Sequence, residues 1–311
     1  MSEQKFSTVE LADIITPRIE AGGTSIIFQR HGKYNRDPSA EDAGSISRES
    51  AETMKEYDRE LFKELMKQPD VYVLFASSDT QYAGKGYRSL ETAQVAQDAA
   101  VEAMLSEDID PLDRVINLNP HFNTARHDPT DRDIRPIAGI REPQIFHPGD
   151  KEYLESLQQK YGYADPDAKK GLSPQAWAMH EMDAEVDARM KTRAEGQEAL
   201  INRTESSLAL LERYAAIWHA NNPNKRLVIW AASHYDTISP LVKKADGTLR
   251  DQDGRLSDAY QPVDYGGGVV INIPSDPGAE KTLERRDSKV SISFGRTAIG
   301  SGITRLNRPN Y

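Results

Sequence analysis

The residues with the clearest chemical potential are the consecutive triplet Arg30-His31-Gly32, which follows the apolar run 26–28. An apolar run that ends in a cation, an imidazole and a glycine is typical of a strand that delivers polar side chains to a sheet edge. The glycine allows the backbone to turn tightly and to approach a ligand closely. The arginine offers a fork of donors to a phosphate group, and a histidine ring nitrogen can attack its phosphorus. The triplet therefore predicts phosphate chemistry if further cationic groups join it.

Two later apolar runs also end in polar residues. The run 71–76 leads into a serine-rich loop, and the predicted helix after it begins at Arg88. The run 226–232 leads into Ser233-His234. Parallel strands place Arg88 and His234 at the sheet edge that holds the first triplet, and a helix N-terminus near Arg88 also favours anions. Because a guanidinium matches phosphate oxygens bidentately, this set predicts a pocket for a dianion.

The order of elements that must position these residues is typical of an α/β fold. Apolar, partly β-branched runs predict strands, and apolar residues at helical spacing predict helices. Strands that alternate with helices indicate a largely parallel or mixed sheet that is covered on both faces. Beyond the opening strand, strands are expected at 70–76, 226–232, 269–273 and 290–294, short strands at 114–118 and 134–140, and helices at 47–67, 88–104 and 204–221.

The composition narrows the class of protein. The chain has 311 residues and no cysteine, which excludes disulfides, thiol catalysis and thiolate metal sites. The net charge of −10 argues against nucleic acid as a partner, and no apolar run has the length of a signal peptide or of a membrane span. A cytoplasmic protein that binds no membrane is therefore expected. Residues 281–311 carry seven Lys/Arg against two acids, so we expect a basic C-terminal segment.

The three polar clusters resemble the marks of the histidine phosphatase superfamily, also called the phosphoglycerate mutase-like superfamily. That family carries Arg-His-Gly after the first strand, Arg-x-x-x-Thr-Ala at the start of a helix that follows a Ser-Ser strand end, and a late Ser-His. Here the matching segments are Arg30-His31-Gly32, residues 88–93 and Ser233-His234, in the same order. The likeness covers roughly residues 24–105 and 205–275.

This resemblance and the order of elements predict a three-layer α/β/α sandwich with a mostly parallel central sheet. Residues 1–311 are expected to form a single domain of this kind. The charged and only partly periodic stretch in the middle of the chain predicts a helical insertion or lid at 143–204.

The resemblance also implies a mechanism. His31 would be the nucleophile and would form a phosphohistidine, while Arg30, Arg88 and His234 would hold the phosphate oxygens. A backbone carbonyl is expected to fix the tautomer of the nucleophile. Asn35 is a further candidate for a phosphate contact.

The general acid has two candidates. One branch of the family uses a Glu after a middle strand, and residues 137–142 resemble that pattern, which makes Glu142 the favoured candidate. Another branch uses an Asp directly after the second histidine, but here Tyr235 stands between His234 and Asp236. Replacing each acid with its amide distinguishes the two.

The function predicted from the sequence is that of a phosphoric monoester hydrolase that needs no metal or other cofactor. Its expected substrate is a small phosphorylated metabolite or a phosphopeptide. The alternatives are a phosphoglycerate mutase-type phosphotransferase, which would need a retained phosphodonor, and a phosphate-binding regulatory module of low turnover. Both alternatives use the same pocket.

Overall fold

The computed structural model describes residues 19–37, 39–68, 70–81, 85–116, 134–142, 197–249, 252, 265–276, 278–285 and 288–292. These residues form a seven-stranded sheet with helices on both faces. In chain order, the elements are β1 (Thr24–Arg30), α2 (Arg48–Met66), β2 (Val71–Ser77), α3 (Arg88–Ser106), the 3-10 helix η1 (Pro111–Asp113), β3 (Arg135–Pro136), the 3-10 helix η3 (Ala138–Ile140), α7 (Gln197–Asn221), β4 (Arg226–Ser233), α8 (Tyr235–Ala245), β5 (Gly268–Ile273), β6 (Lys281–Arg285) and β7 (Ser288–Ile292).

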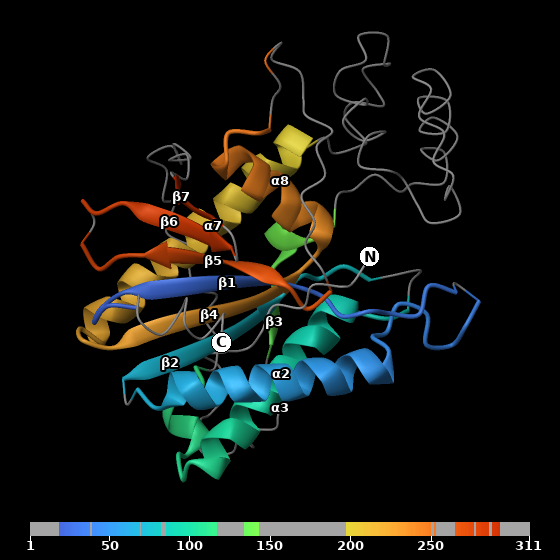
Figure 1. The fold of residues 1–311 in the computed structure, drawn as a ribbon, viewed down its shortest axis with the longest axis horizontal. Coiled ribbons are helices and arrows are strands. Elements are labelled where there is room, and N and C mark those ends of the chain that lie inside the picture. Colours follow the sequence, from blue (N-terminus) through green and yellow to red (C-terminus); the bar gives the residue numbers. More distant parts are fainter. Residues whose placement is uncertain are drawn as a thin grey trace, which may run out of the picture.

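The sheet has the strand order β3-β2-β4-β1-β5-β6-β7 (Figure 1). The first four strands in this order are mutually parallel, whereas β5 is antiparallel to β1, β6 to β5 and β7 to β6. Because β6 therefore points the same way as β1, five of the seven strands run in one direction. The predicted mostly parallel sheet is confirmed, with an antiparallel extension on one side.

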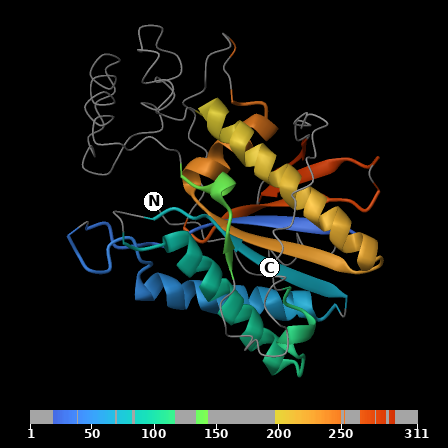
Figure 2. The ribbon, with the colours of Figure 1, turned by 180° about the vertical axis from the view of Figure 1, so that it is seen from behind.

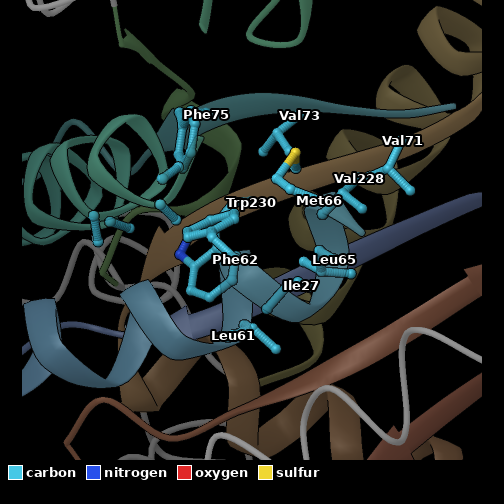
Figure 3. Close-up of a cluster of buried hydrophobic side chains, with 14 of the residues drawn as sticks. Ile27, Leu61, Phe62, Leu65, Met66, Val71, Val73, Phe75, Val228 and Trp230 are labelled. Carbon is cyan, nitrogen blue, oxygen red and sulfur yellow. The ribbon is translucent and has the colours of Figure 1, made fainter. Parts of the chain in front are cut away.

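The predicted three-layer sandwich is also confirmed. Helices α2 and α3 cover one face of the sheet, and α7 and α8 cover the other (Figures 1 and 2). Strand β1 supplies both layers of core, since Ile27 packs into the α2–α3 side while Ile26 and Phe28 pack into the α7–α8 side. This alternation follows from the two-residue period of a strand. On the α2–α3 side, Phe62 packs against Trp230 with ring centroids 5.0 Å apart (Figure 3).

Two segments predicted as strands differ from the expectation where the structure describes them. Residues 114–116 contribute one bridge, between Val115 and Val73, and 117–118 lie outside the described residues. The segment 134–140 forms only the two-residue strand β3 before it turns into η3. The last bond of this segment to β2 is donated by the N–H of Ile137 to the carbonyl of Ser77 at 2.6 Å, after which the chain turns into η3.

Helix α8, strand β6 and the short helix η1 were not predicted from the sequence. Helix α8 buries Ile238, Leu241 and Val242, which do have helical spacing, but an internal Pro240 weakens the pattern. Strand β6 has only Leu283 as an aliphatic residue in its five positions, so it carries no strand signal of its own. Its pairing with β5 decides its conformation.

Parts of the predicted insertion and of the basic segment lie outside the described residues. For the insertion these are residues 143–196, while 197–204 form the start of α7. For the basic segment, residues 281–285 and 288–292 are β6 and β7, and 293–311 lie outside. The extent of the domain and of the insertion stays a prediction.

Within the described part of the chain, no helix combines the length and the apolar content that crossing a membrane requires.

Candidate active site

The ends of three parallel strands lie next to one another and carry the predicted polar clusters. Arg30 at the end of β1 pairs in register with Ser233 at the end of β4. The backbone N–H of His31 then donates to the carbonyl of Ser233 at 2.9 Å. On the other side of β4, the N–H of Ser78 donates to the carbonyl of Ala232 at 2.9 Å. The three strand ends are therefore aligned, and the residues that follow them share one edge of the sheet.

His31 is held in one orientation and one tautomer. Its Nδ1 lies 2.8 Å from the carbonyl oxygen of Gly32, and because a carbonyl can only accept, Nδ1 carries the proton. Its Nε2 accepts a hydrogen bond from Arg88 Nε at 3.1 Å. The expected carbonyl is thus that of Gly32, and the lone pair of Nε2 points to the guanidinium of Arg88.

Side chains of helix α2 leave little space for a Cβ at Gly32. A Cβ at this position would lie 2.6 Å from Ser50 Oγ and 2.9 Å from Met54 Sδ on helix α2. The backbone N–H of Gly32 donates to Thr92 Oγ1 of α3 at 3.1 Å. Both helices therefore approach the chain at the point where it leaves β1, which only glycine permits without displacement.

The second histidine lies beside the first. The ring centroids of His31 and His234 are 5.1 Å apart, which is close enough for both rings to contact one tetrahedral anion. His234 Nε2 lies within hydrogen-bond distance of two serine hydroxyls, at 2.8 Å from Ser78 and 3.1 Å from Ser89. The structure thus brings together two residues that are separated by more than two hundred positions.

Both imidazoles are held neutral. Burial lowers the pKa of His31 well below its ordinary value, and the nearby His234, Arg88 and Arg30 lower it further. Burial also lowers the pKa of His234, with Arg88 and Arg30 acting in the same direction. A neutral His31 keeps the lone pair that a nucleophile needs.

The two predicted arginines reach the site from different elements. Arg88, the first residue of α3, is 2% exposed, and its guanidinium lies 4.3 Å from the ring centroid of Tyr34. The guanidinium of Arg30 lies 3.9 Å from the ring centroid of Tyr265. Two guanidinium groups thus face the same pair of histidines, and aromatic rings hold them there.

Glu142 lies at the same point, as one of the two acid candidates. Its carboxylate accepts a hydrogen bond from Arg88 Nη2, and its Oε1 lies 3.3 Å from His234 Nδ1. Its backbone N–H donates to Thr80 Oγ1 at 3.0 Å. The side chain is 23% exposed, so it borders both the buried histidines and solvent.

The segment before Glu142 is fixed by a residue that sequence reasoning missed. Arg203 of α7 donates to the carbonyl oxygens of Gly139 at 2.8 Å and of Arg141 at 3.1 Å. These bonds join a side chain to backbone carbonyls that lie more than sixty positions earlier, so no local sequence pattern signals them. Tyr34 and Tyr265 were missed for the same reason, because their role depends on the arginines that they contact in space.

Asp236 and Asn35 lie differently from the other candidates. Asp236 is in the first turn of α8, and burial raises its pKa although Arg30 and Arg88 lower it. Asn35 Nδ2 donates to Asp42 at 2.7 Å, and its Oδ1 accepts from the N–H of Asp37 at 3.0 Å. These described bonds use the Asn35 amide within its own loop and do not bring it to the histidines.

One trio in the site has the donor types of a metal centre. Ligand atoms of His31, Glu142 and His234 lie within 4.8 Å of one another. However, the guanidinium of Arg88 already donates to two of the three, the His31 ring and the Glu142 carboxylate. A divalent cation would have to sit against that fixed positive charge, so the electrostatics favour an anion over a metal.

No family model matches the sequence, and no curated protein matches it. Among solved structures, a phosphoglycerate mutase from Bacillus anthracis str. Sterne is 13% identical, with a TM-score of 0.44 over 83% of this chain and 91% of that chain. A mycobacterial glucosyl-3-phosphoglycerate phosphatase is 14% identical, with a TM-score of 0.43 over 80% of this chain and 90% of that chain. A phosphoserine phosphatase from Entamoeba histolytica is 13% identical, with a TM-score of 0.36 over 88% and 97%. This chain is thus similar to structures of a phosphoglycerate mutase and of phosphatases, and its motifs resemble those of the histidine phosphatase superfamily.

Proposed function

We propose that this chain is a metal-independent phosphomonoesterase of the histidine phosphatase type that works through a phosphohistidine. One observation carries the proposal. A neutral imidazole, with its proton fixed on Nδ1 by a carbonyl, directs Nε2 to a buried guanidinium, and its ring centroid lies 5.1 Å from that of a second imidazole. Donors preorganised around a nucleophile in this way stabilise the charge that spreads over phosphate oxygens during transfer.

In the first step, Arg88 binds the phosphate oxygens and releases the Nε2 lone pair of His31, which attacks the phosphorus of a bound monoester. A P–N bond forms, the P–O bond to the leaving group breaks, and the leaving oxygen takes a proton from a general acid. Arg30, Arg88 and His234 hold the three equatorial oxygens as their charge increases. In the second step, water attacks the phosphorus, the P–N bond breaks, and the former acid accepts the proton of water.

Glu142 is the proposed general acid and base. Its contacts with His234 and Arg88 put its carboxylate at the rim of the oxygen-binding groups, where a leaving oxygen would lie. Asp236 is the alternative, since burial raises its pKa and so favours a protonated carboxyl. The expected substrate is a small phosphorylated metabolite or a phosphopeptide.

Hydrolysis of an aryl phosphate in the presence of a chelator tests the function. Phosphate release by the wild-type protein, together with its loss in His31→Ala, is expected, and the trapped phosphoenzyme should disappear in the same variant. His219→Ala is the matched control, because His219 lies on α7 and contacts Thr24 rather than the site. Full hydrolysis by His31→Ala would remove the proposed nucleophile. Phosphate binding without turnover would support the regulatory module, and dependence on a bisphosphate primer would support the mutase.

The acid is tested with leaving groups of different basicity. Loss of a general acid costs typically about 10²–10⁴-fold in rate, and it slows poor leaving groups most. Glu142→Gln is therefore expected to slow an alkyl phosphate far more than a nitrophenyl phosphate, and Asp236→Asn is expected to affect both alike. The reverse pattern would assign the acid to Asp236.

A further inference from the structure

Behind the catalytic strand lies a buried acid that the proposed mechanism does not use. Asp58 of α2 is 2% exposed, and its Oδ1 accepts a hydrogen bond from Gln29 Nε2 at 3.3 Å. Its Oδ2 has no hydrogen-bond partner among the described residues. A buried carboxylate without a cationic partner is costly, so such a group calls for an explanation.

The described residues around Asp58 include few charged side chains. Asp58 borders a small cavity whose walls come from β1, α2, β4 and the turn before β5. Its lining includes Gln29, Tyr57, Trp230 and Gly266. Within this lining, Asp58 and Tyr57 are the titratable residues. The adjacent Arg59 lies 3.6 Å from the Glu60 carboxylate. Burial raises the pKa of Asp58 to about 7, against a smaller lowering by the Gln29 hydrogen bond.

Gln29 connects Asp58 to the turn that carries Tyr265. Besides the bond to Asp58, Gln29 Nε2 donates to the carbonyl of Gly266 at 3.2 Å. Gln29 Oε1 accepts from Trp230 Nε1 at 2.9 Å, so the amide cannot rotate without losing bonds on both sides. Gly266 has φ +75°, a backbone conformation that favours glycine, which makes this turn a well-defined structure.

The same turn holds the phosphate-binding arginine. The N–H of Arg30 donates to the carbonyl of Gly267 at 2.7 Å, and the N–H of Gly266 donates to the carbonyl of Arg30 at 3.1 Å. The ring of Tyr265 lies 3.9 Å from the Arg30 guanidinium and 5.8 Å from the His31 ring. A continuous set of contacts therefore runs from Asp58 through Gln29 and the turn to the site.

We propose that Asp58 is a positioning residue for Arg30, and that its proton decides how firmly Gln29 holds the Tyr265–Gly266 turn. This inference rests on the proposed phosphate site. An ionised carboxylate accepts a hydrogen bond roughly twice as strong as that accepted by a neutral carboxyl. Deprotonation of Asp58 thus fixes Gln29, the turn and Arg30 more tightly, and phosphate binding strengthens.

The expected effect is a modest, pH-linked change in affinity. The difference between a charge-assisted and a neutral hydrogen bond corresponds to about fivefold in binding. Linkage is reciprocal, so saturating phosphate should also make Asp58 more acidic. Because Trp230 bonds to the same Gln29 amide, its fluorescence should report the titration of Asp58 directly.

Binding of inorganic phosphate, measured by calorimetry at about pH 5.5 and about pH 8.5, tests the proposal in wild type and Asp58→Asn. The asparagine keeps an acceptor for Gln29 but stays neutral, so it should match the wild type at low pH and bind about fivefold more weakly at high pH. Taking the ratio of the two proteins at each pH cancels the ionisation of phosphate itself. Glu64→Gln, an exposed change on the same helix, should give a ratio of one throughout.

Three outcomes judge the proposal. A wild-type fluorescence change with a midpoint near pH 7 that is lost in Asp58→Asn, together with the pH-dependent ratio, supports it. A ratio that does not change with pH overturns it and leaves the proposed function intact. No phosphate binding by the wild type at either pH overturns the proposed function, and the positioning role with it. If Asp58→Asn does not fold, Gln29→Met replaces it. Because this variant lacks the amide that links Asp58 to Trp230 and to the turn, it should lose both the fluorescence titration and the pH-dependent change in phosphate binding.

Discussion

Replacing Asp58 with asparagine should stabilise the folded protein, by an amount that grows with pH. The ordinary pKa of the carboxyl is 3.8 and the folded value is about 7. Below the ordinary value, the group is protonated in both the folded and the unfolded state and costs nothing. As pH rises toward 7, the unfolded state loses the proton while the folded state retains it, so unfolding becomes more favourable. Above the folded pKa the cost is constant.

The size of this effect follows from the difference between the two pKa values. A difference of about three pH units corresponds to about 4 kcal/mol in the free energy of unfolding. Because Asp58 is 2% exposed, solvent screening does not reduce this figure much. The variant is therefore expected to gain about 4 kcal/mol on the wild type between about pH 4 and about pH 8, on top of any constant difference.

Urea unfolding of both proteins across this pH range measures the effect, since all other titrating groups are shared and cancel in the difference. Glu64→Gln serves as the control, because it removes an exposed carboxylate from the same helix. A stability difference between Asp58→Asn and wild type that stays constant with pH would show that the pKa of Asp58 is the same in the folded and the unfolded state. That result would refute the reasoning.

Three further predictions follow from the core and the site. Phe62→Ala should lower the free energy of unfolding by about 3–5 kcal/mol, measured by thermal denaturation, because the ring is fully buried against Trp230. Arg203→Met should reduce kcat about tenfold with little change in phosphate affinity, since it frees the carbonyls that hold the Glu142 segment; an equal loss of affinity would contradict this. The acid limb of kcat/KM should lie below pH 6.5, because a lowered pKa keeps His31 neutral to lower pH, and Arg88→Gln should move that limb to higher pH.

Much of the site was predictable because its residues are placed by strand ends. An apolar run ends where polar residues begin, and parallel strands end at the same edge of a sheet, so local patterns were enough to bring Arg30, His31 and His234 together. Glu142 was also predicted as a candidate, and the structure places its carboxylate against Arg88 and His234.

The rest depends on contacts that no local pattern records. Arg203 supports the Glu142 segment from a helix more than sixty residues later, through bonds to backbone carbonyls that any sequence offers. For Asn35, the sequence predicted a contact that the described bonds do not include. It was predicted near the phosphate from its place in the chain, whereas the described bonds of its amide are to Asp42 and Asp37.

The sequence by itself determined the α/β class, the parallel core of the sheet and the cationic edge where β1, β2 and β4 end, because hydrophobic period and strand polarity are local properties. The tertiary structure alone decided the antiparallel extension of β5 to β7, the tautomer of His31 and the burial of Asp58. Each of these depends on which groups meet across the fold and how much water they lose there. Desolvation and pairing are properties of the packed molecule, so they become defined only when distant segments come into contact.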